Sequence, residues 1–176
     1  QSSTMVGQLL AFASRQAVSP EILNINHLVD EMQMMLQKLV GDRIALAWNP
    51  SDDLWPVFID PSQLRQAVIN LAINARDAIA GGGEILIQTK NETCSDTCTI
   101  DHERHTPGDF IMLSVTDNGC GMDKKTLEKI FEPFFTTKSR FKGTGLGLST
   151  VYGIVRQNKG FIVVNSLDAS AHPTAE

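Results

Sequence analysis

Residues 60–83 read DPSQLRQAVINLAINARDAIAGGG, and this stretch decides the fold that we expect. Asp60 suits a helix cap, Pro61 suits the first helical position, and Gln63 stands three residues after the cap, so the stretch predicts a helix start. Apolar residues then recur at helical spacing until three glycines end the pattern. These residues are Leu64, Ala67, Val68, Leu71, Ala75 and Ala78. The pattern predicts one long helix with an apolar stripe that must be buried.

A second stripe on the same helix consists of oxygen-bearing side chains and borders the apolar one. Asn70, Asn74 and Asp77 are spaced at i, i+4 and i+7, which places them along one side of a helix. Such groups could simply hydrogen-bond to neighbouring backbone. They could also bind a hard cation such as Mg²⁺, which prefers oxygen ligands and keeps several waters. The spacing alone leaves both interpretations open.

Shorter patterns flank this helix on both sides and indicate one globular domain. Helices are predicted near 5–13, and over 26–40, 123–131 and 146–158. For the helix at 26–40, Asn26 is the predicted cap and Gly41 the predicted end. Strands are predicted over 43–48, 54–59, 84–90, 110–116 and 161–165.

The composition limits the classes of protein to be considered. At 176 residues and 42% hydrophobic, the chain can bury one substantial core. Its 15 Lys and Arg against 20 Asp and Glu do not favour a general grip on nucleic-acid phosphates. No apolar run is long enough to span a bilayer, and no signal-peptide pattern is present. We expect a cytoplasmic segment without nucleic-acid or direct membrane contact, and three cysteines agree with a reducing compartment.

Two glycine-rich turns carry the remaining chemical signals. In DNGCG at 117–121 an acid directly follows an apolar strand, and the glycines let a ligand approach the backbone closely. The acid could accept a hydrogen bond from an exocyclic amine, although an ordinary Asx turn would look the same. GTGLGLS at 143–149 precedes a helix, whose first amides favour a phosphate. It lacks the Lys-Ser/Thr pair of a Walker loop, so neither turn alone identifies a function.

Together and in this order, the motifs resemble the four sequence boxes of sensor histidine kinases. NLAINARDA at 70–78 resembles the N box, DNGCGM at 117–122 the first glycine box, FEPFFTTK at 131–138 the F box, and GTGLGL at 143–148 the second glycine box. LLAFASRQ at 9–16 is similar to the exit of that family's dimerisation hairpin. VYGIV at 151–155 is typical of the hybrid-type branch, which often carries sensory and receiver domains. The resemblance covers residues 6–166.

This resemblance implies the C-terminal catalytic ATP-binding domain, with the Bergerat fold shared by gyrase, Hsp90 and MutL. That fold is α+β, a two-layer sandwich in which a mixed sheet packs against about three helices. Residues 1–18 would be the end of the dimerisation helix or a linker, 19–168 the catalytic domain, and 169–176 a disordered tail.

The resemblance also implies a site for ATP and Mg²⁺. Asn74 would ligate Mg²⁺, and Asp117 would hydrogen-bond to the adenine amine. The other ATP-binding residues would be Asn70, Asp77, Ala78, Gly119, Gly121, Met122, Thr137, Lys138, Gly143, Thr144, Gly145, Leu146, Gly147 and Leu148.

Asn70 distinguishes between branches of this fold. ATP-hydrolysing relatives carry a glutamate four residues before the magnesium-binding asparagine, where it acts as general base. An amide at that place cannot take a proton, which favours phosphoryl transfer to a histidine of the dimerisation domain. A response regulator receiver domain would be the next partner, and the full-length protein would be a homodimer. Two alternatives are a regulatory nucleotide-binding module without phosphotransfer and an ATP-hydrolysing relative.

The histidines and cysteines add two expectations. The four histidines are His27, His102, His105 and His172. The family's phosphoacceptor histidine stands in a helix directly before an acidic residue, and none of these four does. We therefore expect the acceptor upstream of this chain. Cys94, Cys98, His102 and His105 could hold a metal or simply lie in an exposed hairpin loop. The glycine turn and last strand that usually follow in the family are missing after Ser166.

Overall fold

The computed structural model describes residues 18–94, 98–100, 103–105, 107–138 and 143–167. The expected dimerisation segment at 1–18 lies outside these residues except for Val18, and so does the expected tail at 169–176. Within the described part of the chain, no helix is both long and apolar enough to cross a membrane.

The first layer is a three-stranded sheet in the order β2-β4-β7. β2 (Ile44–Asn49) runs parallel to β4 (Gly83–Cys94), and β4 runs antiparallel to β7 (Gly108–Asp117). Alternate residues Ile85, Ile87 and Thr89 of β4 are buried, as the period of two in a strand requires. The predicted mixed sheet is confirmed.

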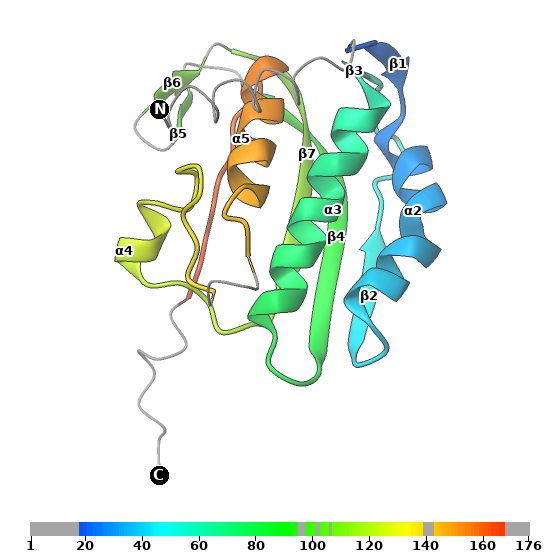
Figure 1. Cartoon of the computed structure of the whole chain (residues 1–176). Helices are drawn as coiled ribbons and strands as arrows, with labels where there is room; N and C mark the ends of the chain where they lie inside the picture. The colour runs from blue at the N-terminus through cyan, green and yellow to red at the C-terminus, as the bar shows by residue number, and fades with distance from the viewer. Residues whose placement is uncertain (1–17, 95–97, 101–102, 106, 139–142, 168–176) are drawn as a thin grey trace.

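Three helices lie side by side on one face of this sheet and form the second layer (Figure 1). They are α2 (Ile25–Val40), α3 (Pro61–Ala78) and α5 (Gly147–Gln157). α3 is the middle helix, and its Val68 is fully buried together with Val29 and Leu36 of α2. Burying each such side chain stabilises the fold by roughly 1.5–3 kcal/mol. The two-layer α+β sandwich is therefore confirmed.

Capping groups set the helix starts. Asp60 caps α3 as predicted, because its carboxylate accepts from the Ser62 N–H at 2.7 Å. The predicted cap of α2 is wrong: Asn24, not Asn26, accepts from the backbone at that end. The side chain of Asn26 instead donates to the Ser51 carbonyl and accepts from the Thr89 hydroxyl. Because these tertiary hydrogen bonds occupy the Asn26 side chain, it does not cap the helix.

A second pair of strands was predicted only in part. β1 (Glu21–Leu23), which the sequence pattern did not indicate, pairs antiparallel with β3 (Val57–Ile59). β3 is shorter than the predicted strand at 54–59, because the Trp55 N–H bonds to the Asn91 side chain and Pro56 has no N–H. β5 (Cys98–Ile100) and β6 (Glu103–His105) form a further two-stranded ribbon.

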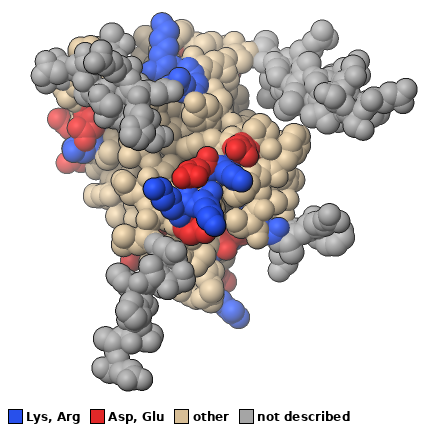
Figure 2. Space-filling model, turned by 90° about the vertical axis from the view of Figure 1, so that its left-hand side faces the viewer, with Lys and Arg blue, Asp and Glu red and all other residues tan. Residues whose placement is uncertain are grey.

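The region between β7 and α5 is less regular than predicted. α4 spans only Lys124–Leu127, and the chain then continues in tight turns such as Glu132 N–H to Lys129 carbonyl. On the side of the molecule where α4 lies, acidic and basic side chains gather in one mixed group (Figure 2), so this face has no uniform charge.

The predicted strand at 161–165 is absent, since residues 161–167 carry no strand in the structure. The ring of Phe161 packs edge-on against Phe110 of β7, with ring centroids 5.2 Å apart. Successive residues Val163 and Val164 are both exposed. Without one buried face, the alternating pattern loses the burial that would favour a strand here.

Candidate functional site

The oxygen-bearing stripe of α3 faces the glycine-rich loop before α5. A Cβ on Gly147 would stand 3.5 Å from Asn74 Nδ2 and 3.9 Å from Asn70 Cγ, so this glycine lies directly over the two amides. Asn74 Nδ2 is buried and has no hydrogen-bond partner in the described structure. Leaving a buried polar group unpaired costs about 1–3 kcal/mol. The unpaired Nδ2 makes Asn74 a candidate for contact with a ligand.

The DNGCG turn is docked onto the end of the same helix. The Cys120 N–H donates to the Ala78 carbonyl at 2.9 Å, and a Cβ on Gly119 would stand 2.6 Å from that oxygen. Only glycine permits this approach. Asp117 Oδ1 accepts from the Gly119 N–H at 2.9 Å, which closes an Asx turn and leaves Oδ2 without a partner among the described residues.

The C-terminal segment closes the other side of this turn. Gly121 has a φ of 68°, a conformation that favours glycine, and a Cβ there would collide with the Leu167 carbonyl. The Met122 N–H donates to the Ser166 hydroxyl at 2.8 Å. The segment expected to depart from the family pattern therefore supports the turn through Ser166 and Leu167.

The glycine loop is held by the F-box segment. The Phe134 N–H donates to the Gly145 carbonyl at 2.8 Å, and both residues have positive φ, 69° and 66°. A Cβ on Gly145 would collide with the Phe134 backbone. The positive φ of Phe134 is a strained conformation for a residue other than glycine, and its bond to Gly145 holds the loop against residues 131–135.

The loop delivers the start of α5 to the site. α5 begins at Gly147, its cap Leu146 makes no side-chain cap bond, and the Leu146 N–H donates to the Thr144 hydroxyl at 3.4 Å. The amides of the first turn, including that of Leu148, have no intrahelical acceptor. An uncapped helix start of this kind favours an anion such as a phosphate.

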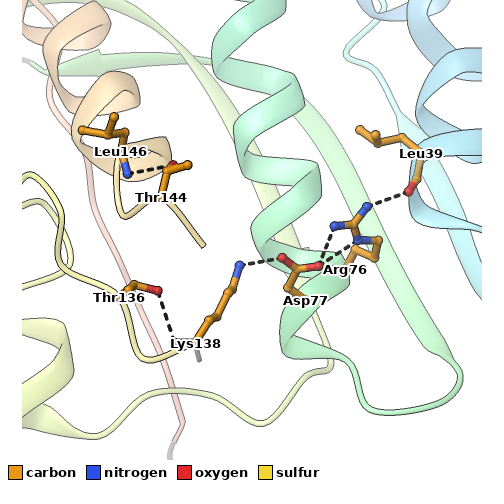
Figure 3. Close-up of polar contacts among 7 residues, drawn as sticks. All are labelled: Leu39, Arg76, Asp77, Thr136, Lys138, Thr144 and Leu146. Carbon is orange, nitrogen blue, oxygen red and sulfur yellow. Dashed lines mark hydrogen bonds and ion pairs between the residues drawn. The ribbon is translucent and has the colours of Figure 1, made fainter. Parts of the chain in front are cut away.

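The Asp77 carboxylate forms ion pairs with Arg76 of α3 and with Lys138 of the F-box segment (Figure 3). Lys138 Nζ lies 2.6 Å from its Oδ2, and Arg76 Nη2 lies 2.7 Å from its Oδ1. Burial of the carboxylate raises the pKa of Asp77, but the hydrogen bonds and charges of Lys138 and Arg76 outweigh this, so the pKa is lowered. Arg76 also donates to the Leu39 carbonyl at the end of α2, 3.2 Å away.

Most of the predicted site residues thus meet around the C-terminal half of α3. Gly143 joins them, since a Cβ there would stand 3.2 Å from Lys138 Cδ. Thr137 is exposed and makes no bond to the others in the described structure. An open hollow of about 420 Å³ is lined by Val40, Arg43 and Arg76, and none of the residues predicted for the site lines it.

Sequence reasoning missed Arg76 and Ser166 as parts of the site, and it gave Phe134, within the F-box motif, a packing role rather than the backbone bond to Gly145. Arg76 stands within the N-box motif, so its neighbours could have indicated it. The roles of Phe134 and Ser166 depend on contacts with residues 11 and 44 positions away, respectively, which no local pattern reports.

The possible metal cluster falls mainly outside the described structure. His102 is not described, and neither are the side chains of Cys98 and His105. Cys94 is disulfide-bonded, which differs from the free thiols expected in a reducing compartment, whereas Cys120 is a free and exposed thiol. Among the described residues, no group of three or more His, Cys, Asp or Glu could hold a metal ion.

Comparison with known proteins connects this geometry to a family. A family model described as "Histidine kinase-, DNA gyrase B-, and HSP90-like ATPase" matches residues 59–173. The sensor kinase CckA of Brucella abortus is 45% identical over 166 residues, which are 94% of this chain and 18% of that protein. The chain therefore spans about a fifth of the length of this relative.

Solved structures share the fold. Full-length ShkA in complex with AMPPNP matches with a TM-score of 0.61 and 26% identity, over 87% of this chain and 30% of ShkA. The nucleotide-free catalytic domain of histidine kinase ThkA matches with a TM-score of 0.59 and 27% identity, over 80% of this chain and 82% of that domain.

Proposed function

Because the chain belongs to the family of histidine kinase-, DNA gyrase B- and HSP90-like ATPases, we propose that it holds Mg-ATP and offers the terminal phosphoryl group to a histidine elsewhere in its parent protein. The observation that carries this proposal is Asn74 Nδ2, a buried atom that has no hydrogen-bond partner among the described residues and lies beside Gly147. A structural asparagine in a core would have its polar atoms satisfied.

Asn74 fits a magnesium ligand. Rotating the side-chain amide of Asn74 by 180° would place Oδ1 where Nδ2 now lies. That oxygen would then coordinate Mg²⁺, a hard cation that keeps most of its water ligands. Asn70, beside it under Gly147, offers a second oxygen for the cation's waters. When bound, Mg²⁺ would neutralise charge on the phosphates.

The two turns fit the two ends of the nucleotide. Asp117 would accept from the adenine amine through Oδ2, because its Oδ1 is already engaged by the Gly119 N–H. The first amides of α5 and the ammonium of Lys138 would contact the phosphates. Asp77, Ala78, Gly121 and Met122 would shape the space between, and Thr144 would hold the loop through the Leu146 N–H.

Asn70 favours transfer over hydrolysis. A water molecule attacks efficiently only when a base removes its proton, and an amide at this place cannot act as that base. Catalysis would then consist of positioning the phosphoryl group for a nucleophile that another segment supplies. We propose the dimerisation domain of the parent protein, acting as a homodimer, as the source of this histidine. A response regulator aspartate would be the next acceptor.

Titration calorimetry with ATP tests the nucleotide site. We expect Mg²⁺-dependent binding by the wild-type chain, and a loss of roughly ten- to a hundredfold in affinity for Asn74→Ala. Asn49→Ala, at the exposed end of β2, is the matched control and should bind like wild type. Binding that ignores both Mg²⁺ and the Asn74 substitution would overturn the assignment.

A phosphorylation assay tests the reaction. Adding a dimerisation segment that carries its histidine should produce an acid-labile phosphohistidine with the wild-type chain and none with Asn74→Ala. ATP binding without any phosphotransfer to the histidine segment would favour a regulatory nucleotide-binding module instead. Steady hydrolysis by the chain alone would favour an ATPase.

A further inference from the structure

A continuous series of polar contacts links three elements at the end of α3 (Figure 3). The Leu39 carbonyl of α2 accepts from Arg76 Nη1 at 3.2 Å, and Arg76 Nε donates to Asp77 Oδ1 at 2.8 Å. The second oxygen of Asp77 accepts from Lys138 Nζ at 2.6 Å. Lys138 of the F-box segment therefore contacts α3 through the Asp77 carboxylate, and Arg76 in turn binds that carboxylate.

The Lys138 ammonium has two N–H donors that make no hydrogen bond within the described structure. It carries three N–H donors, and the bond to Asp77 is the only one it makes within the described structure. Its stem lies against the start of the glycine loop, because a Cβ on Gly143 would stand 3.2 Å from Lys138 Cδ. The side chain is 30% exposed, so the two remaining donors can be reached from solvent.

We propose that Asp77, steadied by Arg76, is a positioning residue that holds the Lys138 ammonium between α3 and the glycine loop with two donors directed to nucleotide phosphates. This inference rests on the proposed function. Asp77 then acts on the phosphates through Lys138. The three charges sum to +1, so the group attracts a polyphosphate even though it contains a carboxylate.

The direction in which Asp77→Asn changes ATP affinity distinguishes the positioning role from a purely electrostatic role of Asp77. If Asp77 only placed negative charge beside the phosphates, Asp77→Asn would remove a repulsion and tighten ATP binding. If Asp77 positions Lys138, the same substitution releases a long flexible side chain, whose ordering cost then falls on nucleotide binding.

The test is a double-mutant cycle on the 176-residue chain, with ATP and adenosine titrated in the presence of Mg²⁺. We expect Asp77→Asn and Lys138→Met each to weaken ATP binding by roughly three- to fivefold. Adding Asp77→Asn to Lys138→Met should cause no further loss, because the carboxylate acts only through the lysine. Adenosine, which lacks phosphates, should bind equally well to all variants.

The ion pair Lys90–Glu92 provides a matched control, because its charged atoms are also 2.6 Å apart but it lies on β4 outside the site. Glu92→Gln should leave ATP binding unchanged, and thermal unfolding of every variant checks that it is folded. Tighter or unchanged ATP binding by folded Asp77→Asn would overturn the positioning role. A wild-type chain that binds neither ATP nor adenosine would instead overturn the proposed function.

Discussion

The backbone N–H of Ser19 donates to Asp60 Oδ2 at 2.8 Å, so the start of the described chain is tied to the cap of α3. The other carboxylate oxygen accepts from the N–H and the hydroxyl of Ser62, at 2.7 and 2.6 Å. Asp60 is only 6% exposed. The Ser62 hydroxyl, with the Ser19 and Ser62 amides, lowers the pKa of Asp60. Asp60 thus connects the segment before β1 to the helix that carries Asn74.

Substituting Asp60→Asn should lower the melting temperature at neutral pH by roughly 2–5 °C, because the negative charge at the start of α3 and the acceptor for the Ser19 N–H are both lost. A carboxyl group with a lowered pKa stabilises the fold above its unfolded pKa of about 3.9, and this contribution is lost as pH falls through the folded value. The difference in melting temperature between wild type and Asp60→Asn should therefore persist at pH 5–7 and begin to narrow below about pH 4.

Thermal unfolding from pH 7 to pH 3.5 measures this difference. Asp52→Asn, at an exposed turn, is the control and should follow wild type throughout. A gap for Asp60→Asn that stays constant down to pH 3.5 would show that the charge of Asp60 does not stabilise the fold.

Two glycines should respond to alanine in opposite directions. Gly119→Ala would place a Cβ 2.6 Å from the Ala78 carbonyl, which separates the turn from α3 and breaks the Cys120 bond. We expect a lower melting temperature and roughly tenfold weaker ATP binding. Gly153→Ala has no atom within 4 Å and lies in α5, so it should stabilise the fold by about 0.5–1 kcal/mol. Equal effects of the two substitutions on ATP binding would contradict the close packing of the turn.

The regular elements were predictable because their signals are local. The apolar period of α3, its Asp60 cap and the alternation in β4 each lie within one short stretch. The order of the glycine turns likewise indicated which residues would meet around Asn74. These features need no knowledge of the rest of the chain.

The parts that were missed depend on tertiary contacts. Asn26 is a good cap by residue type, but its amide is taken by Ser51 and Thr89. The bond from Phe134 to Gly145 requires a positive φ in a phenylalanine, which sequence statistics disfavour. The grip of Lys138 on Asp77 joins residues 61 positions apart. No periodicity or motif spacing contains such information.

The alkylation rate of the Cys120 thiol can show where the nucleotide binds. Its thiol is free and exposed between the two glycines that would border the adenine. Bound Mg-ATP should slow its alkylation by iodoacetamide in proportion to occupancy, about tenfold when free ATP is ten times the dissociation constant. Mass spectrometry of the Cys120 peptide measures the rate. Asn74→Ala at the same ATP concentration should lose this protection, and an unchanged rate in saturated wild type would place the nucleotide elsewhere.

Asp117→Asn should change which base the site prefers. Asparagine can still accept from the Gly119 N–H through Oδ1, but it presents an NH₂ group where Asp117 presents its free Oδ2. Two donors would then face each other when adenine binds, so ATP affinity should fall roughly ten- to a hundredfold. ITP carries an oxygen in place of the adenine amine, and its affinity should hold or improve. Calorimetric titration of both nucleotides decides the point, because an equal loss for ATP and ITP would mean that Asp117 only maintains the turn.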